Sequence, residues 1–163
     1  MTLALDASVE IASEGGERTM KIEDFIVGPL TSALEPGEIL VQVRVPLPAA
    51  RTGSAYEKHP HPASRFAVAG VAAVLTLDAS GAVQGARLVV TGLGSKATRA
   101  AAAEKALVGR KPDAAAIKAA AAQVTEGIEV RDDLNGTAAY RKNLAAVMAE
   151  RAIGRAAARA AGA

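Results

Sequence analysis

The chain has 163 residues, of which 50% are apolar, 2% aromatic and 22% charged, with a formal net charge of +2, so it can form one domain or two small subdomains. The slight charge and the scarcity of aromatic residues argue against a nucleic-acid-binding surface. The absence of Cys excludes disulfides, thiolate metal ligands, a cysteine nucleophile and an iron–sulfur cluster held by this chain.

The first predicted elements are short strands. Residues 7–13 and 18–22 flank the sequence Glu-Gly-Gly-Glu, whose glycines permit positive φ, so a β-hairpin is expected. Residues 38–45 alternate, and Pro46 ends the strand because it cannot donate a ladder hydrogen bond. The residues predicted to share one apolar face are Ile39, Val41, Val43 and Val45, with Gln42 and Arg44 on the other.

A second hairpin is predicted in the middle of the chain. Residues 66–77 are apolar without alternation, which is typical of a strand covered on both faces. Residues 78–81, Asp-Ala-Ser-Gly, form the expected turn into a strand over residues 83–91.

Ala-rich helices are expected after Arg110 and are anticipated by residues 98–107. Pro112 and Asp113 suit the start of a helix over residues 114–124. In the last segment Tyr140, Leu144, Val147 and Met148 recur at helical spacing, which predicts a buried face, with Arg141, Lys142 and Arg151 elsewhere. The tail, residues 153–163, is expected to be a fraying helix end. The predicted fold class is α+β, a small mixed or antiparallel sheet followed by about three helices.

Two histidines are candidate metal ligands. His59 and His61 are two residues apart, so in an extended segment both side chains point to one side and could chelate a metal. No third ligand is identifiable from spacing, and Pro60 and Pro62 indicate a stiff loop instead. We therefore expect no metal site.

Other motifs also have ordinary structural readings. Residues 92–97, Gly-Leu-Gly-Ser-Lys-Ala, formally fit the dinucleotide fingerprint, but Asp113, about twenty residues on, opens a helix rather than ending a parallel strand. A strand-to-helix turn is the favoured reading. Asp132 and Asp133 suit helix entry. No serine or histidine completes a nucleophile, base and orienter set, so we expect no catalytic residue in this chain.

Four collinear blocks resemble one family. The sequence DFIVGPLTSALEPGEILVQVRVP, residues 24–46, resembles D-F-F-x-G-x-x-x-T-x-L-x-x-x-E-I-L-x-x-V-x-V-P of the FAD-binding medium subunits of molybdenum hydroxylases, the flavoproteins of the carbon monoxide dehydrogenase and xanthine dehydrogenase family. The further blocks are SAYEKHPHPAS with FAVAGVAAVLTLD, then ARLVVTGLGSKATRAAAAEKALVG, then DLNGTAAYRKNLAAVMAERAI. They cover nearly the whole chain.

The resemblance implies an organisation and a role. Residues 1–50 would be a remnant of the second FAD-binding subdomain, and residues 51–163 a domain like the flavoprotein C-terminal domain. Family members pass electrons from a molybdenum-cofactor large subunit, through a 2Fe-2S small subunit, to FAD and an external acceptor. The chain would be an oxidoreductase subunit, inactive alone, with those two subunits as partners.

The chain departs from the family where FAD is held. Members bind its diphosphate with two N-terminal glycine-rich segments, and this sequence opens just after the second, so we expect a truncated subunit that does not bind FAD tightly alone. Leu40 and, within one residue, Lys58 match family positions beside the isoalloxazine ring. Leu40 could cover the ring face, and the Lys58 ammonium could stabilise the reduced anion. The alternatives are a core leucine and a solvated lysine.

Two functional hypotheses therefore remain open. The first is a truncated flavoprotein subunit, completed by a missing N-terminal part. The second is a flavin-free docking or oligomerisation module without activity. Truncation predicts an apolar patch or open sheet edge on the first strands and self-association into a homo-oligomer. No segment approaches the ~20 apolar residues of a membrane span, and we expect a soluble, cytoplasmic protein that binds neither nucleic acid nor membranes.

Overall fold

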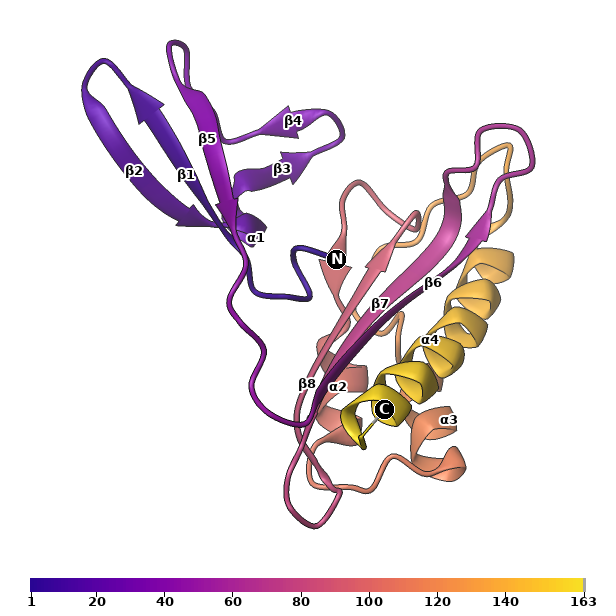
Figure 1. Cartoon of the computed structure of the whole chain (residues 1–163). Coiled ribbons are helices and arrows are strands. Elements are labelled where there is room, and N and C mark those ends of the chain that lie inside the picture. Colours follow the sequence, from indigo (N-terminus) through magenta and orange to yellow (C-terminus); the bar gives the residue numbers. More distant parts are fainter. Residues whose placement is uncertain (163) are drawn as a thin grey trace.

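The structure is a computed structural model that describes residues 1–162, and it has two lobes (Figure 1). The N-terminal lobe contains a three-stranded antiparallel sheet in the order β2-β1-β5, together with a short helix and a two-stranded hairpin. Its elements are β1 (Ser8–Ser13), β2 (Gly16–Lys21), α1 (Ile22–Phe25), β3 (Ile26–Gly28), β4 (Thr31–Ser32) and β5 (Ile39–Arg44).

The first hairpin confirms the expectation drawn from Glu-Gly-Gly-Glu. Strands β1 and β2 pair from Ser8 opposite Lys21 to Ser13 opposite Gly16, which leaves a two-residue turn. Gly16 has a φ of +125°, a conformation that side chains rarely adopt. The Ser13 hydroxyl accepts a hydrogen bond from the Gly15 N–H at 3.2 Å and further closes the turn.

Strand β5 forms where the alternation predicted it, but its apolar residues are not buried. All six of its residues are exposed, and a β-bulge shifts the register so that Val43 lies opposite Val9 while Leu40 lies opposite Ile11. The single apolar face expected from strict alternation is therefore interrupted, because a bulge adds one unpaired residue. The open sheet edge and apolar patch expected of the first strands are both present here.

The C-terminal lobe is built on a four-stranded antiparallel sheet in the order β6-β7-β8-β9. Its central strand is buried on both faces, as predicted, although it begins at Ala67 and leaves Phe66 79% exposed. The Asp78 carboxylate accepts hydrogen bonds from the N–H groups of Ser80 and Ala82, which makes the predicted turn. The strands are β6 (Thr52–Pro60), β7 (Ala67–Leu77), β8 (Val83–Thr91) and β9 (Thr98–Arg99).

Three helices cover one face of this sheet (Figure 1). They are α2 (Ala101–Leu107), α3 (Ala114–Ala122) and α4 (Ala138–Ala160). Asp113 caps α3 by accepting a hydrogen bond from the Ala116 N–H at 2.8 Å, as its position predicted. Helix α2 begins later than residue 98, because Thr98 and Arg99 first pair with β8.

Helix α4 corrects two expectations. The tail does not fray at residue 153, because the helix continues to Ala160 and buries Ile153, Ala156 and Ala160. The buried face is also rotated from the predicted one: Tyr140 and Val147 are 45% and 37% exposed, whereas Arg141 is 5% exposed. Alanine lines most of the contact, so the large apolar residues alone gave the wrong face.

The chain's first residues join the two lobes. Leu3, Ala4 and Ala7 pack in one core with Ala72 of β7 and Val89 of β8, on the face of the sheet that the helices leave free. Asp6 pairs with Arg87 at 2.7 Å, and Lys96 Nζ donates to the Ile26 carbonyl at 3.1 Å. No helix within residues 1–162 is long and apolar enough to cross a membrane.

Candidate functional site

The face of the four-stranded sheet that the helices leave free carries the first candidate site. A pocket of about 290 Å³ lies there, between this face and the N-terminal segment. The residues that line it are Met1, Thr2, Leu3, Ile26, Tyr56, Ala72, Val89, Thr91 and Ala97. Since residues from both lobes line the pocket, their relative placement determines its shape.

The floor of this pocket consists of two neighbouring rungs of the sheet. Tyr56, Ala72 and Val89 form one rung, and Lys58, Gly70 and Thr91 form the next. Side chains alternate along a strand, so all six lie on the face opposite the helix-covered core. The central strand contributes only glycine and alanine, which leaves a low floor between taller flanking residues.

Gly70 makes room for the Tyr56 ring. A Cβ at Gly70 would lie 2.6 Å from the Tyr56 hydroxyl oxygen and 3.1 Å from Thr91 Cγ2. Tyr56 is 39% exposed, and burial raises the pKa of its hydroxyl above the ordinary value. The tyrosine therefore lies across the central strand and presents an aromatic edge to the pocket.

Lys58 is exposed on β6, one rung beyond Tyr56. Its Nζ donates to the Arg65 carbonyl at 2.9 Å, which ties the strand to the far end of its own hairpin. Leu40 lies on β5 of the other lobe, 37% exposed and opposite the buried Ile11. The two residues that the sequence selected therefore lie on different sheets, and the structure joins them by proximity to neither a common strand nor a common helix.

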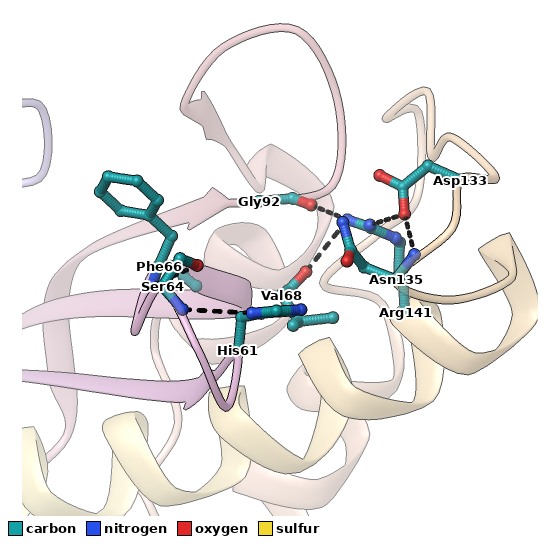
Figure 2. Close-up of a pocket in the computed structure, with 9 residues that line it drawn as sticks. His61, Ser64, Phe66, Val68, Gly92, Asp133, Asn135 and Arg141 are labelled. Carbon is teal, nitrogen blue, oxygen red and sulfur yellow. Dashed lines mark hydrogen bonds and ion pairs between the residues drawn. The ribbon is translucent and has the colours of Figure 1, made fainter.

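A second pocket, of about 300 Å³, lies at the far end of the β6–β7 hairpin and surrounds Arg141 (Figure 2). The guanidinium donates to the carbonyls of Val68, Gly92 and Gly136 and pairs with Asp133. Four of its five N–H donors are thus already used, so the group serves as a structural tether between segments rather than as a free anion-binding site.

The carboxyl group of Asp133 completes this tether. The backbone N–H of Asn135 donates to it at 2.7 Å and, with the Arg141 guanidinium, lowers its pKa. Asp132 accepts a hydrogen bond from the Ala138 N–H at 2.6 Å at the start of α4, which confirms the helix-entry role predicted for the pair.

The histidines have structural contacts. His61 Nδ1 accepts hydrogen bonds from the N–H groups of Ala63 and Ser64, both at 3.3 Å, so it holds the loop that joins β6 to β7 (Figure 2). His59 belongs to the paired part of β6, opposite Ala69. Within residues 1–162 there is no group of three His, Cys, Asp or Glu side chains placed to hold a metal ion.

The glycine-rich turn at residues 92–97 does not form a dinucleotide site. It leads into the short strand β9, and α2 begins only at Ala101, so no helix N-terminus points at the turn. Gly92 has a φ of +81°, and a Cβ there would lie 2.4 Å from the Ala67 carbonyl oxygen. Close packing of the turn against β7 explains this glycine.

Sequence reasoning missed Tyr56, Gly70 and Arg141. Tyr56 stands two residues before Lys58, which places both on one face of a strand, and a lone glycine inside an apolar strand marks a close approach. Arg141 begins a row with Ala145, Ala149 and Ala152 on one side of α4. Counting alanine as a core residue would have revealed this row.

An antiparallel sheet backed by three helices, preceded by a smaller sheet that shares its core, is the architecture of flavoprotein subunits among the solved structures. The chain resembles the carbon monoxide dehydrogenase from Hydrogenophaga pseudoflava, with a TM-score of 0.89 and 36% identity over 97% of this chain and 55% of that chain. It matches quinoline 2-oxidoreductase from Pseudomonas putida 86 with a TM-score of 0.89 and 32% identity, covering 98% of this chain and 55% of the other.

Two family models match the two lobes. Residues 54–156 match the CO dehydrogenase flavoprotein C-terminal domain, and residues 1–48 match the FAD binding domain in molybdopterin dehydrogenase. The chain belongs to this family, the FAD-binding medium subunits of molybdenum hydroxylases.

The curated relatives are subunits of dehydrogenase and hydroxylase complexes. The chain is 34% identical to the alpha subunit of the 6-hydroxypseudooxynicotine dehydrogenase complex of Paenarthrobacter nicotinovorans, over 94% of this chain and 52% of the relative. It is 35% identical to the carbon monoxide dehydrogenase medium chain of Afipia carboxidovorans, over 96% of this chain and 54% of the relative. The chain thus spans about half the length of the curated relatives it matches.

Proposed function

We propose that this chain provides the isoalloxazine-facing half of the flavoprotein subunit of a molybdenum hydroxylase. In the complete complex the bound FAD accepts electrons from iron–sulfur clusters and delivers them to an external acceptor. The observation that carries the proposal is the low floor of Gly70 and Ala72 beneath the pocket shared by the two lobes. A flat aromatic ring needs such a floor.

Three residues of this chain would meet the ring. Tyr56 offers an aromatic edge beside the pocket, and Lys58 stands on the same face one rung away. A positive charge near the ring favours added electrons, so Lys58 would stabilise the reduced cofactor. Leu40 would cover the ring from the N-terminal lobe; its exposed side chain leaves it free to do so.

The described residues fit the ring end of FAD better than its diphosphate end. A diphosphate is held by several backbone N–H groups at a helix N-terminus or nest. The turn between β1 and β2 and the turn at residues 92–97 both lead into strands, so neither opens a helix. We infer that other polypeptide supplies the diphosphate contacts, and that the chain alone is inactive and binds FAD weakly.

The domain boundary and the partners belong to the same proposal. Residues 1–50 would complete the second FAD-binding subdomain, and residues 51–163 would form the C-terminal domain; the two family models meet near residue 50, which supports this division. The partners would be a molybdenum-cofactor large subunit and a 2Fe-2S small subunit in the cytoplasm. Relatives named as subunits of multi-subunit complexes support these partners.

A second candidate function follows from a different observation. Five apolar side chains of β5 and the following segment are at least 44% exposed, which is typical of a surface that another polypeptide covers. A flavin-free module that docks or self-associates through this surface would need no ring site. The residues are Ile39, Val41, Val43, Val45 and Leu47.

A FAD titration separates the two functions. Flavin fluorescence and anisotropy would be followed with the chain alone and with the chain plus the N-terminal fragment that precedes the match in the Afipia carboxidovorans medium chain. We expect micromolar binding only with the fragment. Binding that Lys58→Met leaves unchanged in affinity but that shifts the flavin midpoint potential negatively, with Lys58→Arg restoring it, supports the ring site. Absence of flavin binding in both mixtures favours the docking module.

A further inference from the structure

Strand β5 has one free edge with an apolar character. It pairs only with β1, so one row of its backbone N–H and C=O groups has no strand partner. All six of its residues are exposed, with Ile39 at 70% and Val41 at 58%. A six-residue apolar edge of this kind is a template for strand addition.

The other sheet edges of the molecule are protected. Strand β2 carries Glu17, Arg18 and Lys21. On β6, Arg155 pairs with Glu57 and Arg159 donates to the Ser54 carbonyl, so α4 covers that edge. Strand β9 has only two residues. Since natural sheets protect the edges they leave in water, the unprotected β5 edge indicates a covered one.

The core of the N-terminal lobe also stops one strand short. Val9 and Ile11 of β1 are 0% and 1% exposed, whereas their partners across the ladder, Val43 and Leu40, are 44% and 37% exposed. Both pairs lie on the same face, because directly opposed residues point the same way. Something that extends the sheet past β5 would complete the burial of Val43 and Leu40.

The occupant follows from the lengths of the relatives. The listed relatives are about twice as long as the match, which covers 52% and 54% of the first two. The C-terminal family model already occupies residues 54–156, so the additional polypeptide lies on the N-terminal side of the match, next to the FAD-binding model over residues 1–48. Ser8 pairs with Arg44, so this N-terminal side enters the sheet at the end where β5 leaves it.

We propose that β5 is the docking strand for the N-terminal part of the FAD-binding domain, which adds a β-strand to its free edge and covers Leu40 and Val43. The addition extends the three-stranded sheet to at least four strands. It also fixes Leu40, so the same contact that completes the sheet places a ring-covering residue. In this respect the inference rests on the proposed function.

Sedimentation and hydrogen exchange test this inference without flavin. The chain is mixed with the N-terminal fragment of the Afipia carboxidovorans medium chain, and complex formation is followed by sedimentation velocity. We expect a one-to-one complex, with new protection of alternate backbone amides in β5. Val41→Lys should weaken the complex at least about tenfold, because a charge on the edge opposes pairing. Thr19→Lys on the exposed β2 edge is the matched control and should bind like the parent chain.

Three results would overturn the inference. One is the absence of a complex at about 50 µM, above the range of ordinary protein interfaces. Another is equal weakening by Val41→Lys and Thr19→Lys while circular dichroism shows both variants folded. The third is a complex of the chain with itself that the fragment does not displace, which would make a second copy the occupant. Because no FAD is present, a complex without later flavin binding would sink the proposed function and leave this inference standing.

Discussion

The two lobes bury their sheets to very different extents. In the C-terminal lobe, β7 is covered by helices on one face and by the N-terminal segment on the other. In the N-terminal lobe, β5 is exposed along its whole length, and the core includes Ala72 and Val89 from the neighbouring lobe. The C-terminal lobe therefore has the contacts of an independent folding unit, whereas the N-terminal lobe depends on that neighbour and on further polypeptide.

The largest expected effect tests the self-sufficiency of the C-terminal lobe. A Cβ at Gly53 of β6 would lie 2.1 Å from the Ala156 carbonyl oxygen of α4, so Gly53→Val must displace the helix. We expect a loss of about 3 kcal/mol in the free energy of unfolding, measured by urea denaturation. Gly85→Val on β8 is the control, since its Cβ would have no neighbour within 4 Å. Equal stability of the two variants would contradict the close contact between β6 and α4.

The Arg141 tether tests how the ends of the same lobe are held. Arg141→Met leaves the carbonyls of Val68 and Gly92 without their buried donor. We expect unfolding to become about 2 kcal/mol easier, since an unsatisfied buried acceptor is costly, with faster hydrogen exchange at the start of β7. Lys142→Met changes the neighbouring exposed residue and should have little effect. If Lys142→Met were as damaging as Arg141→Met, helix charge rather than the tether would be responsible.

A pH titration examines the weaker lobe. Arg18 Nε donates to Glu38 at 2.6 Å, and this hydrogen bond, with that of the Glu35 N–H, lowers the pKa of Glu38 from 4.5 to about 2. Because the folded-state pKa is depressed, the stabilisation is complete above pH 4.5 and is lost as the pH falls towards 2. Hydrogen exchange of β2 and β5 should therefore be faster in Glu38→Gln than in the parent chain at pH 6.

The same experiment at low pH provides the check. Near pH 2 the parent carboxyl is half protonated, so most of the difference between the parent chain and Glu38→Gln should vanish. Glu35→Gln, which changes a side chain outside the ion pair, should match the parent throughout. A difference that persists undiminished at pH 2 would mean that Glu38 acts through packing and not through its charge.

The smallest expected effect concerns the pocket between the lobes. Gly70→Ala would place a methyl group 2.6 Å from the Tyr56 hydroxyl, and the flexible ring end must swing towards solvent. The pKa of Tyr56, raised by burial, should then fall towards its ordinary value of 10.0. Ultraviolet titration of phenolate formation measures it, with Tyr56→Phe identifying the signal. An unchanged titration would show that Tyr56 does not lie over Gly70.

Much of the fold was predictable because local rules determine it. The Glu-Gly-Gly-Glu hairpin, the Asp78 turn and the Asp113 cap all depend on residues within a few positions of one another. Helix α4 was predicted as an element but with the wrong buried face and the wrong end. Its contact surface is mostly alanine, and alanine gives little periodic signal because it occurs on every face of this helix.

The candidate site was predictable only in part. Lys58 was singled out from its motif, and its strand neighbour Tyr56 follows from the period of two. Gly70 beneath the Tyr56 ring belongs to the paired strand, so its role depends on the register between β6 and β7. Leu40 and Lys58 remain predicted ring contacts, and the lobes that carry them supply their two sides.

The sequence by itself determined the strands, turns, caps and family of this protein, since these depend on nearby residues and on ordered motifs. Only the tertiary structure decided which of them are covered. Arg141 is buried because Val68 and Gly92, 73 and 49 positions away, bring their carbonyls to it. Strand β5 stays exposed for the complementary physical reason: its alternation predicts burial, but burial requires a partner surface, and no described residue provides one on its free edge.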